Sequence, residues 1–175
     1  MFDALKSFGT IVVTGPQRSG TKIVAEMLAD DLGLRYVNEA EYGVHCFERF
    51  WTVLSEKAVV HGPAISAYCH LLPASVAVVF VFRDDAEIMA SQAHVTGWLT
   101  HEAPRELQKY FRGPFEQSVA AVKYEAWRHF QKPAMREAGK IYIELHYPED
   151  VLAHPRYVPS ERRKDWEPQQ TRPRG

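Results

Sequence analysis

Short apolar runs alternate with segments of helical periodicity along this chain. The runs are rich in β-branched residues, which is typical of strands buried in a parallel sheet, and they cover residues 11–13, 34–37, 58–60, 76–82 and 141–145. Apolar residues recur at helical spacing between and around these runs, over residues 21–32, 42–55, 64–72, 84–95, 105–112 and 115–131. The last helix is expected to bury the stripe Phe115, Val119, Val122, Ala126 and Phe130. This alternation predicts a parallel sheet with helices on both faces and ligands at the carboxyl ends of the strands.

A glycine-containing loop joins the first predicted strand to the first helix. Its residues are Gly15, Pro16, Gln17, Arg18, Ser19 and Gly20. Unpaired backbone N–H groups and the helix dipole converge where such a loop enters a helix, which makes an anion site. Gly20 permits close approach of the anion, and Arg18 supplies a cation. Ser19 and Thr21 add hydroxyl donors, so we expect residues 17–21 to bind phosphate or sulfate.

The loop departs from the phosphate-binding pattern G-x-x-x-x-G-K-[ST] at one position. Gly15 and Gly20 have the required spacing, but Thr21 stands where lysine is expected and Lys22 follows one residue later. A shift of one residue turns a helical side chain by about 100°. We therefore expect Arg18 to be the main cation of the loop. The alternative role for Lys22 is an ion pair with Glu26 one helical turn away.

Polar side chains also follow the next three predicted strands. These are Glu39 and Glu41 after the second strand, His61 after the third, and Arg83, Asp84 and Asp85 after the fourth. Because the carboxyl ends of parallel strands share one edge of a sheet, we expect these side chains to lie close to the loop. Each also has a plain structural alternative. The glutamates would be solvated loop acids, His61 a buried hydrogen-bonded residue, and Asp84 a helix N-cap.

Composition sets limits on the class of protein. The chain has 175 residues, 46% hydrophobic residues and a net charge of −1, which suits one folded domain without a global attraction to polyanions. The longest apolar run is too short to span a bilayer, and the first residues carry no signal-peptide pattern. Cys46 and Cys69 have no metal-ligand spacing. We expect a cytoplasmic enzyme with no membrane partner, and a homodimer is compatible with the sequence.

Residues 17–21 resemble the [KR]-S-G-T element of the sulfotransferase-type P-loop, in which the cation precedes Ser-Gly-Thr. Arg83 and Ser91 look like that family's site for the 3′-phosphate of the donor, and His61 stands where the family places its catalytic histidine. The resemblance implies sulfuryl transfer from phosphoadenosine phosphosulfate without a metal. Asp84 and Asp85 would repel such a doubly phosphorylated donor, and they suit a Mg²⁺–nucleotide complex better.

The chain also resembles small P-loop kinases of nucleosides and nucleotides. This resemblance implies a single-domain P-loop NTPase-like three-layer α/β sandwich, with a parallel five-stranded sheet in the order 2-3-1-4-5. It implies ATP or another nucleoside triphosphate with Mg²⁺ as the donor, bound by residues 15–22. Glu39 or Glu41 would be the base that accepts the hydroxyl proton. Asp84, Asp85 and Thr21 would be ligands of the metal.

The same resemblance suggests an acceptor and a division of the chain into a domain, a lid-like segment and a tail. The chain resembles compact P-loop kinases encoded by bacterial viruses, which act on hydroxymethylated pyrimidines in DNA. We expect a P-loop transferase domain over 1–158, with a basic lid-like segment at 97–113. Residues 159–175 form a basic tail, expected to be flexible, that could touch a DNA backbone.

The sequence therefore predicts a nucleotide-dependent transferase acting on a hydroxyl acceptor. Phosphoryl transfer to a nucleoside, a nucleotide or a hydroxymethylpyrimidine in DNA is placed ahead of sulfuryl transfer. A nucleotide-binding module without turnover is the third alternative. The candidate catalytic residues are Arg18, Glu39, Glu41 and His61. Glu39 or Glu41 acts as the base in a kinase, and His61 acts as the base in a sulfotransferase.

Overall fold

Five parallel strands form the centre of the protein in a computed structural model that describes residues 2–43, 47–93, 119–155 and 157. The strands are β1 (Thr10–Thr14), β2 (Arg35–Val37), β3 (Ala58–His61), β4 (Val76–Phe82) and β5 (Tyr142–His146). They pair in the order β2-β3-β1-β4-β5, and every pairing is parallel. The predicted sheet is confirmed in strand number, direction and order.

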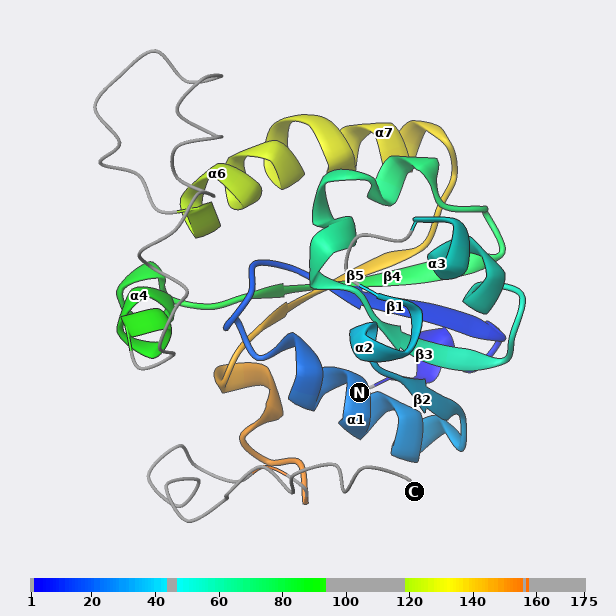
Figure 1. Ribbon diagram of the computed structural model, residues 1–175, viewed down its shortest axis with the longest axis horizontal. Coiled ribbons are helices and arrows are strands. Elements are labelled where there is room, and N and C mark those ends of the chain that lie inside the picture. Colours follow the sequence, from blue (N-terminus) through cyan, green and yellow to red (C-terminus); the bar gives the residue numbers. More distant parts are fainter. Residues whose placement is uncertain (1, 44–46, 94–118, 156, 158–175) are drawn as a thin grey trace.

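Helices cover both faces of this sheet (Figure 1). They are α1 (Thr21–Leu32), α2 (Glu39–Tyr42), α3 (Phe47–Val53), α4 (Asp85–Ala93), α6 (Val119–Ala126) and α7 (Lys132–Glu137), with a π-helical turn at Trp127–Gln131. Short 3₁₀ helices lie at Asp3–Leu5, Pro63–Ala67, Cys69–Leu71 and Glu149–Val151. The result is a three-layer α/β sandwich, as predicted.

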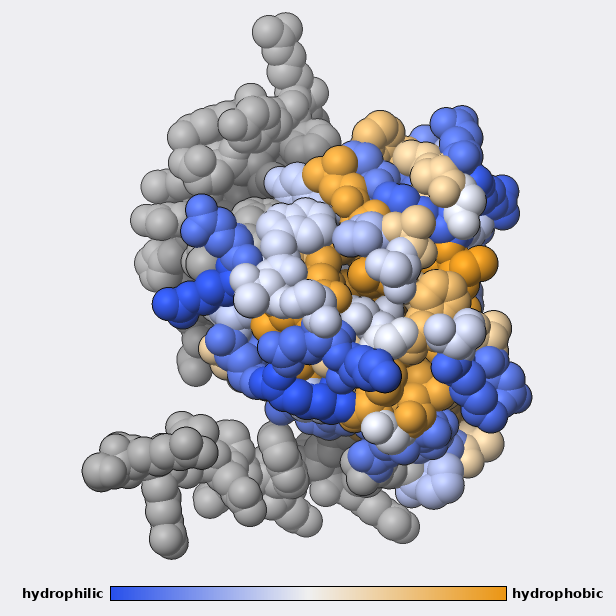
Figure 2. Space-filling model, turned by 90° about the vertical axis from the view of Figure 1, so that its right-hand side faces the viewer, coloured by the Kyte–Doolittle hydropathy of each residue, from blue (hydrophilic) through white to orange (hydrophobic). Residues whose placement is uncertain are grey.

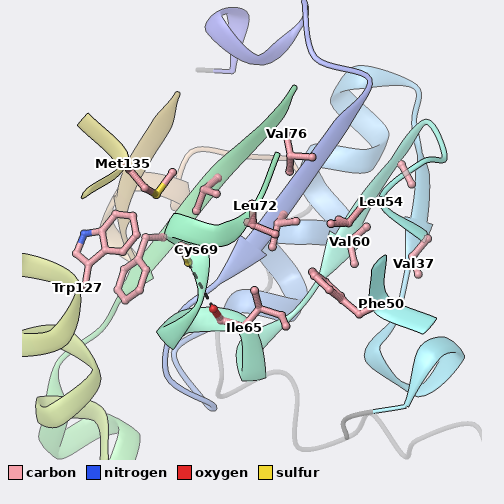
Figure 3. Packing of buried hydrophobic residues seen from close by; sticks show 14 of the residues in the cluster. Val37, Phe50, Leu54, Val60, Ile65, Cys69, Leu72, Val76, Trp127 and Met135 are labelled. Atoms are coloured by element: carbon pink, nitrogen blue, oxygen red, sulfur yellow. Dashed lines mark hydrogen bonds between the residues drawn. The ribbon is translucent and has the colours of Figure 1, made fainter. Parts of the chain in front are cut away.

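Alternate residues of each strand enter two separate cores. Ile11 and Val13 of β1 pack with α1, whereas Val12 points to the other face. The second core receives Phe50 from α3 and Trp127 from the C-terminal helices (Figure 3). All these residues are at most 1% exposed, so both faces of the sheet are sealed by apolar contacts.

The helices differ from the sequence prediction in three places. The helix expected over 42–55 is replaced by α2 and α3, and the one expected over 64–72 by two 3₁₀ helices. The stripe expected on the last helix was wrong at its C-terminal end, because Phe130 is 57% exposed. Phe115, its first member, lies outside the described residues. The buried residues are Ala120, Tyr124, Trp127, Gln131 and Met135. Gln131 replaces an apolar residue there because its side chain bonds to His70 and to the Ala67 carbonyl.

The carboxyl ends of the strands define the functional edge of the sheet. In Figure 1 they lie toward α4, and Figure 2 views the opposite end, where apolar patches are broken by hydrophilic side chains. Within the described ranges no helix is long and apolar enough to cross a membrane. The predicted lid-like segment 97–113 and tail 159–175 lie outside the described residues, as does Cys46.

Candidate functional site

The loop between β1 and α1 depends on two glycines and one strained arginine. Gly15, Arg18 and Gly20 have φ values of 145°, 71° and 93°, all in a region that side chains disfavour. A Cβ on Gly15 would lie 2.5 Å from the Val81 carbonyl oxygen, and one on Gly20 would lie 2.6 Å from the ring of Tyr147. Both positions therefore require glycine on grounds of space as well as conformation.

Internal hydrogen bonds fix the shape of this loop. The Ser19 hydroxyl is fully buried and donates to the Pro16 carbonyl at 2.7 Å, so it braces the turn. The first bond of α1 runs from the Val24 N–H to the Gly20 carbonyl at 3.1 Å. The N–H groups that precede it stand at the open N-terminus of the helix, where they have no intrahelical acceptor. An anion placed there accepts hydrogen bonds from these N–H groups.

Arg18, Arg83 and Ser91 are linked by hydrogen bonds. The Arg18 Nε donates to Ser91 Oγ at 3.1 Å, which links the loop to α4. Arg83 donates from its Nη1 to the Arg18 carbonyl at 2.9 Å and from its Nε to Glu87 at 2.8 Å. The guanidinium of Arg83 therefore supports the strained residue of the loop and sits beside the anion site.

Tyr147 is a part of the site that the sequence analysis missed. It follows β5, lies under Gly20, and has the Arg83 guanidinium 5.5 Å from its ring centre. An aromatic residue directly after the last strand was the available signal, since ligands gather at strand ends. Tyr147 forms the wall on which the loop rests.

Thr21 and Lys22 point in different directions at the start of α1. Thr21 is 3% exposed, and its Oγ1 lies 3.0 Å from His61 Nε2. Lys22 is on the outer surface, with its Nζ 3.9 Å from Glu26 Oε1. The ion pair foreseen as the alternative for Lys22 is present.

His61 is the last residue of β3 and is 7% exposed. Burial, reinforced by the charge of Lys22, lowers the pKa of His61 to about 4. The imidazole is therefore neutral at neutral pH. Its Nδ1 is buried without a hydrogen-bond partner among the described residues. The backbone beyond it is held by the Tyr42 hydroxyl, which donates to the His61 carbonyl at 2.7 Å.

Glu39 and Glu41 lie in α2 rather than in a turn or a continuing strand. Asn38 caps this helix by accepting from the Ala40 N–H at 3.1 Å, and Glu41 closes the capping box by accepting from the Asn38 N–H at 2.9 Å. Glu41 also pairs with Arg35 at 2.6 Å. Glu41 thus has a structural role in the start of α2.

Glu39 is the first residue of that helix and has a different environment. Its Oε2 is buried and has no hydrogen-bond partner within the part of the chain that the structure describes. Burial raises the pKa of Glu39, and the positive charge of Lys123 acts against that rise. Lys123 comes from α6 and donates to the Pro63 carbonyl at 3.3 Å. A single lysine in a helix gave no signal in the sequence, because only the fold places it beside α2.

Asp84 and Asp85 stand at the start of α4. Asp84 Oδ1 accepts from the Glu87 N–H at 3.1 Å, so the N-cap foreseen as its alternative is confirmed. No group of three His, Cys, Asp or Glu side chains that could hold a metal occurs among residues 2–43, 47–93 and 119–155. Mg²⁺ on a nucleotide needs only one or two carboxylates besides phosphate oxygens and water. Asp84 and Asp85 supply that number of carboxylates at the start of α4.

Comparison with known proteins gives similarity to solved structures only, and eight of their chains match. No family model and no curated protein sequence matches this chain. Among solved structures it is similar to the shikimate kinase from Acinetobacter baumannii, solved in complex with shikimate. The two chains are 18% identical, with a TM-score of 0.38, over 82% of this chain and 87% of that chain.

Proposed function

We propose that this protein transfers a phosphoryl group from ATP, or another nucleoside triphosphate, to a hydroxyl acceptor. The observation that carries the proposal is the Glu39 carboxylate, whose Oε2 is buried without a hydrogen-bond partner among the described residues. It stands after β2, separated by β3 alone from the strand that delivers the anion loop. A base placed there faces an acceptor bound next to the transferred group.

The loop supplies the electrostatic part of the chemistry. Phosphoryl transfer depends mainly on positioning and on stabilising the charge of the transferred group. Backbone N–H groups of residues 17–21 bind that charge, other than the N–H of Ser19, which donates to the Pro16 carbonyl. Arg18 leaves Ser91 to close over the bound group. Arg83 holds the Arg18 carbonyl and so keeps the loop in its strained shape. Lys22 remains with Glu26 on the outer surface.

Mg²⁺ would neutralise the charge of the donor phosphates when the nucleotide binds. Asp85 and the second carboxylate oxygen of Asp84 are the protein groups that would hold it, together with water. Thr21 was the third predicted ligand. Its hydroxyl is hydrogen-bonded to His61, so Thr21 can bind the metal only after that hydrogen bond is broken.

Glu39 is the base in this proposal, and Glu41 is not. The Glu41 carboxylate is engaged by Arg35 and by the Asn38 N–H. Glu39 is half-buried, which raises its pKa toward neutral pH and makes its carboxylate a stronger proton acceptor. His61 orients Thr21 and does not take the proton. The acceptor would be a nucleoside, a nucleotide or a hydroxymethylated pyrimidine in DNA.

One experiment tests the proposed reaction. The full chain is incubated with Mg–[γ-³²P]ATP and separate acceptors, which are nucleosides, nucleoside monophosphates and DNA containing hydroxymethylated pyrimidines. Label should move to an acceptor with the wild type and not with Glu39→Gln, while both bind ATP. Nucleotide that binds but stays intact with every acceptor would overturn the proposal and favour a module without turnover.

Sulfuryl transfer is the second candidate, and a specific contact favours it. Arg83 and Ser91 both contact Arg18, and the sulfotransferase resemblance assigns this pair of residues to the 3′-phosphate of the donor. A neutral His61 would then be the base. Transfer of ³⁵S from phosphoadenosine phosphosulfate in the presence of a chelator, lost in His61→Asn and kept in Glu39→Gln, would establish this alternative.

A further inference from the structure

The turn from His61 to Pro63 is contacted from two sides by elements far apart in the sequence. On one side, the Tyr42 hydroxyl of α2 donates to the His61 carbonyl at 2.7 Å. On the other side, the Lys123 Nζ of α6 donates to the Pro63 carbonyl at 3.3 Å. The structure therefore brings α2 and α6 to the same short turn at the functional edge of the sheet.

Glu39 belongs to the α2 side of this turn. It precedes Tyr42 by three residues in the same helix, so the two side chains share a helix face. The charges of Glu39 and Lys123 act on each other: Lys123 opposes the rise in the pKa of Glu39, and Glu39 opposes the fall in the pKa of Lys123 that burial causes. The two groups form no ion pair with each other in the described structure. Glu39 lies one helical turn from Tyr42, which bonds to the His61 carbonyl, and Lys123 bonds to the Pro63 carbonyl two residues further on.

Among the described residues, both groups keep some hydrogen-bonding capacity that a ligand can use. A lysine ammonium carries three N–H donors, and the hydrogen bond to Pro63 uses one of them. Glu39 Oε2 is buried with no hydrogen-bond partner among the described residues. Buried charges are costly unless they are paired and hydrogen-bonded. A ligand that brings a hydroxyl to Glu39 and an oxygen acceptor to Lys123 would meet both needs.

We propose that Lys123 binds the acceptor opposite Glu39, and that this subsite selects acceptors carrying an acid group near the reacting hydroxyl. The inference rests on the proposed function for the role of Glu39. Lys123 positions the acceptor by its acid oxygens, and Glu39 receives the hydroxyl proton as the oxygen bonds to the transferred phosphorus and the nucleoside diphosphate leaves. An acid group is preferred over a neutral oxygen because its hydrogen bond to an ammonium is stronger.

Calorimetry with matched probes tests this subsite without requiring turnover. The full chain is loaded with Mg²⁺ and a non-hydrolysable ATP analogue. It is then titrated with thymidine 5′-monophosphate and thymidine, and with glycerate and glycerol. The wild type should bind an acid member more tightly than its neutral partner. Lys123→Met should lose this preference by about tenfold or more, and Lys123→Arg should retain most of it.

Two controls separate this inference from a folding defect. Lys132→Met removes a lysine that pairs with Glu144 on β5, at the opposite edge of the sheet from β2, and it should keep the preference. Thermal unfolding and affinity for the ATP analogue should be unchanged in Lys123→Arg. An undiminished preference in both Lys123 variants, or no binding of either acid by the wild type, would overturn the inference. Acid binding that depends on Lys123 without any transfer would uphold the subsite and remove the proposed reaction instead.

Discussion

Thr21 Oγ1 lies 3.0 Å from His61 Nε2, so the first residue of α1 is tied to the last residue of β3 inside the protein. In the usual phosphate-binding loop a lysine occupies the position of Thr21. Here that position faces the interior and makes a neutral hydrogen bond. The loop must therefore take its positive charge from another residue, and Arg18 is the exposed cation within it.

We expect Arg18→Ala to weaken nucleotide binding by about 10- to 100-fold, the range for loss of a hydrogen bond to a charged group. Lys22→Ala should weaken it less, since the ammonium pairs with Glu26 at 3.9 Å on the outer surface. Calorimetric titration with Mg–ATP measures both. A larger loss of affinity in Lys22→Ala would show that Lys22, and not Arg18, is the main cation for the nucleotide.

Glu39→Gln should abolish transfer and leave nucleotide affinity within about twofold, because the amide cannot accept the hydroxyl proton. A positioned base accelerates such reactions by roughly 10²–10⁴-fold, which sets the size of the loss in kcat. Glu41→Gln is the matched control. It should keep transfer and change the free energy of unfolding little, because glutamine also closes a capping box and the lost ion pair with Arg35 is on the surface. Equal activity of the two variants would remove Glu39 from the mechanism.

The stability of the protein should fall as the pH is lowered through the range in which His61 titrates. Its pKa is lowered from 6.5 to about 4 in the fold, so the unfolded chain binds a proton that the folded chain does not. Free energy of unfolding is thus lost as pH drops from about 6.5 toward 4, with about 2 kcal/mol gone near pH 5. Urea unfolding at several pH values, compared between wild type and His61→Asn, measures this. An identical slope in both would assign the acid sensitivity to other groups.

Metal dependence should distinguish the two donors. If the donor is Mg–ATP, a chelator should remove binding, and Asp85→Asn should weaken it while leaving the cap that Asp84 provides to α4 intact. If the donor is phosphoadenosine phosphosulfate, the chelator should have no effect. Ser91→Ala should then reduce affinity for 3′-phosphorylated adenosine selectively. Calorimetry with each nucleotide, with and without chelator, separates these results.

The sequence was sufficient for the sheet and the loop because both are encoded locally. The run 76–82 is buried at every position, and the glycine spacing around Arg18 required a tight turn. Which face of the last helix is buried was not predictable from the local sequence. Gln131 is buried there only because His70 and Ala67, which lie far away in the sequence, supply its hydrogen-bond partners.

The candidate site was predictable only in the parts that follow strands. Glu39 and Glu41 were equivalent in the sequence, and the capping box that separates their roles depends on where α2 begins. Lys123 and Tyr147 reach the site from elements late in the chain, by contacts with Pro63 and Gly20. No spacing rule connects such pairs, since tertiary packing alone brings them together.

The contact between Gly20 and the ring of Tyr147 has a consequence for the order in which the protein matures. The loop belongs to the start of the chain, but the surface that shapes it follows β5, near the end of the described residues. A chain leaving the ribosome therefore completes β1 and α1 long before the loop has its support. We therefore expect the loop to take its final shape only when β5 pairs with β4, and nascent chains truncated before Tyr147 should fail to bind nucleotide.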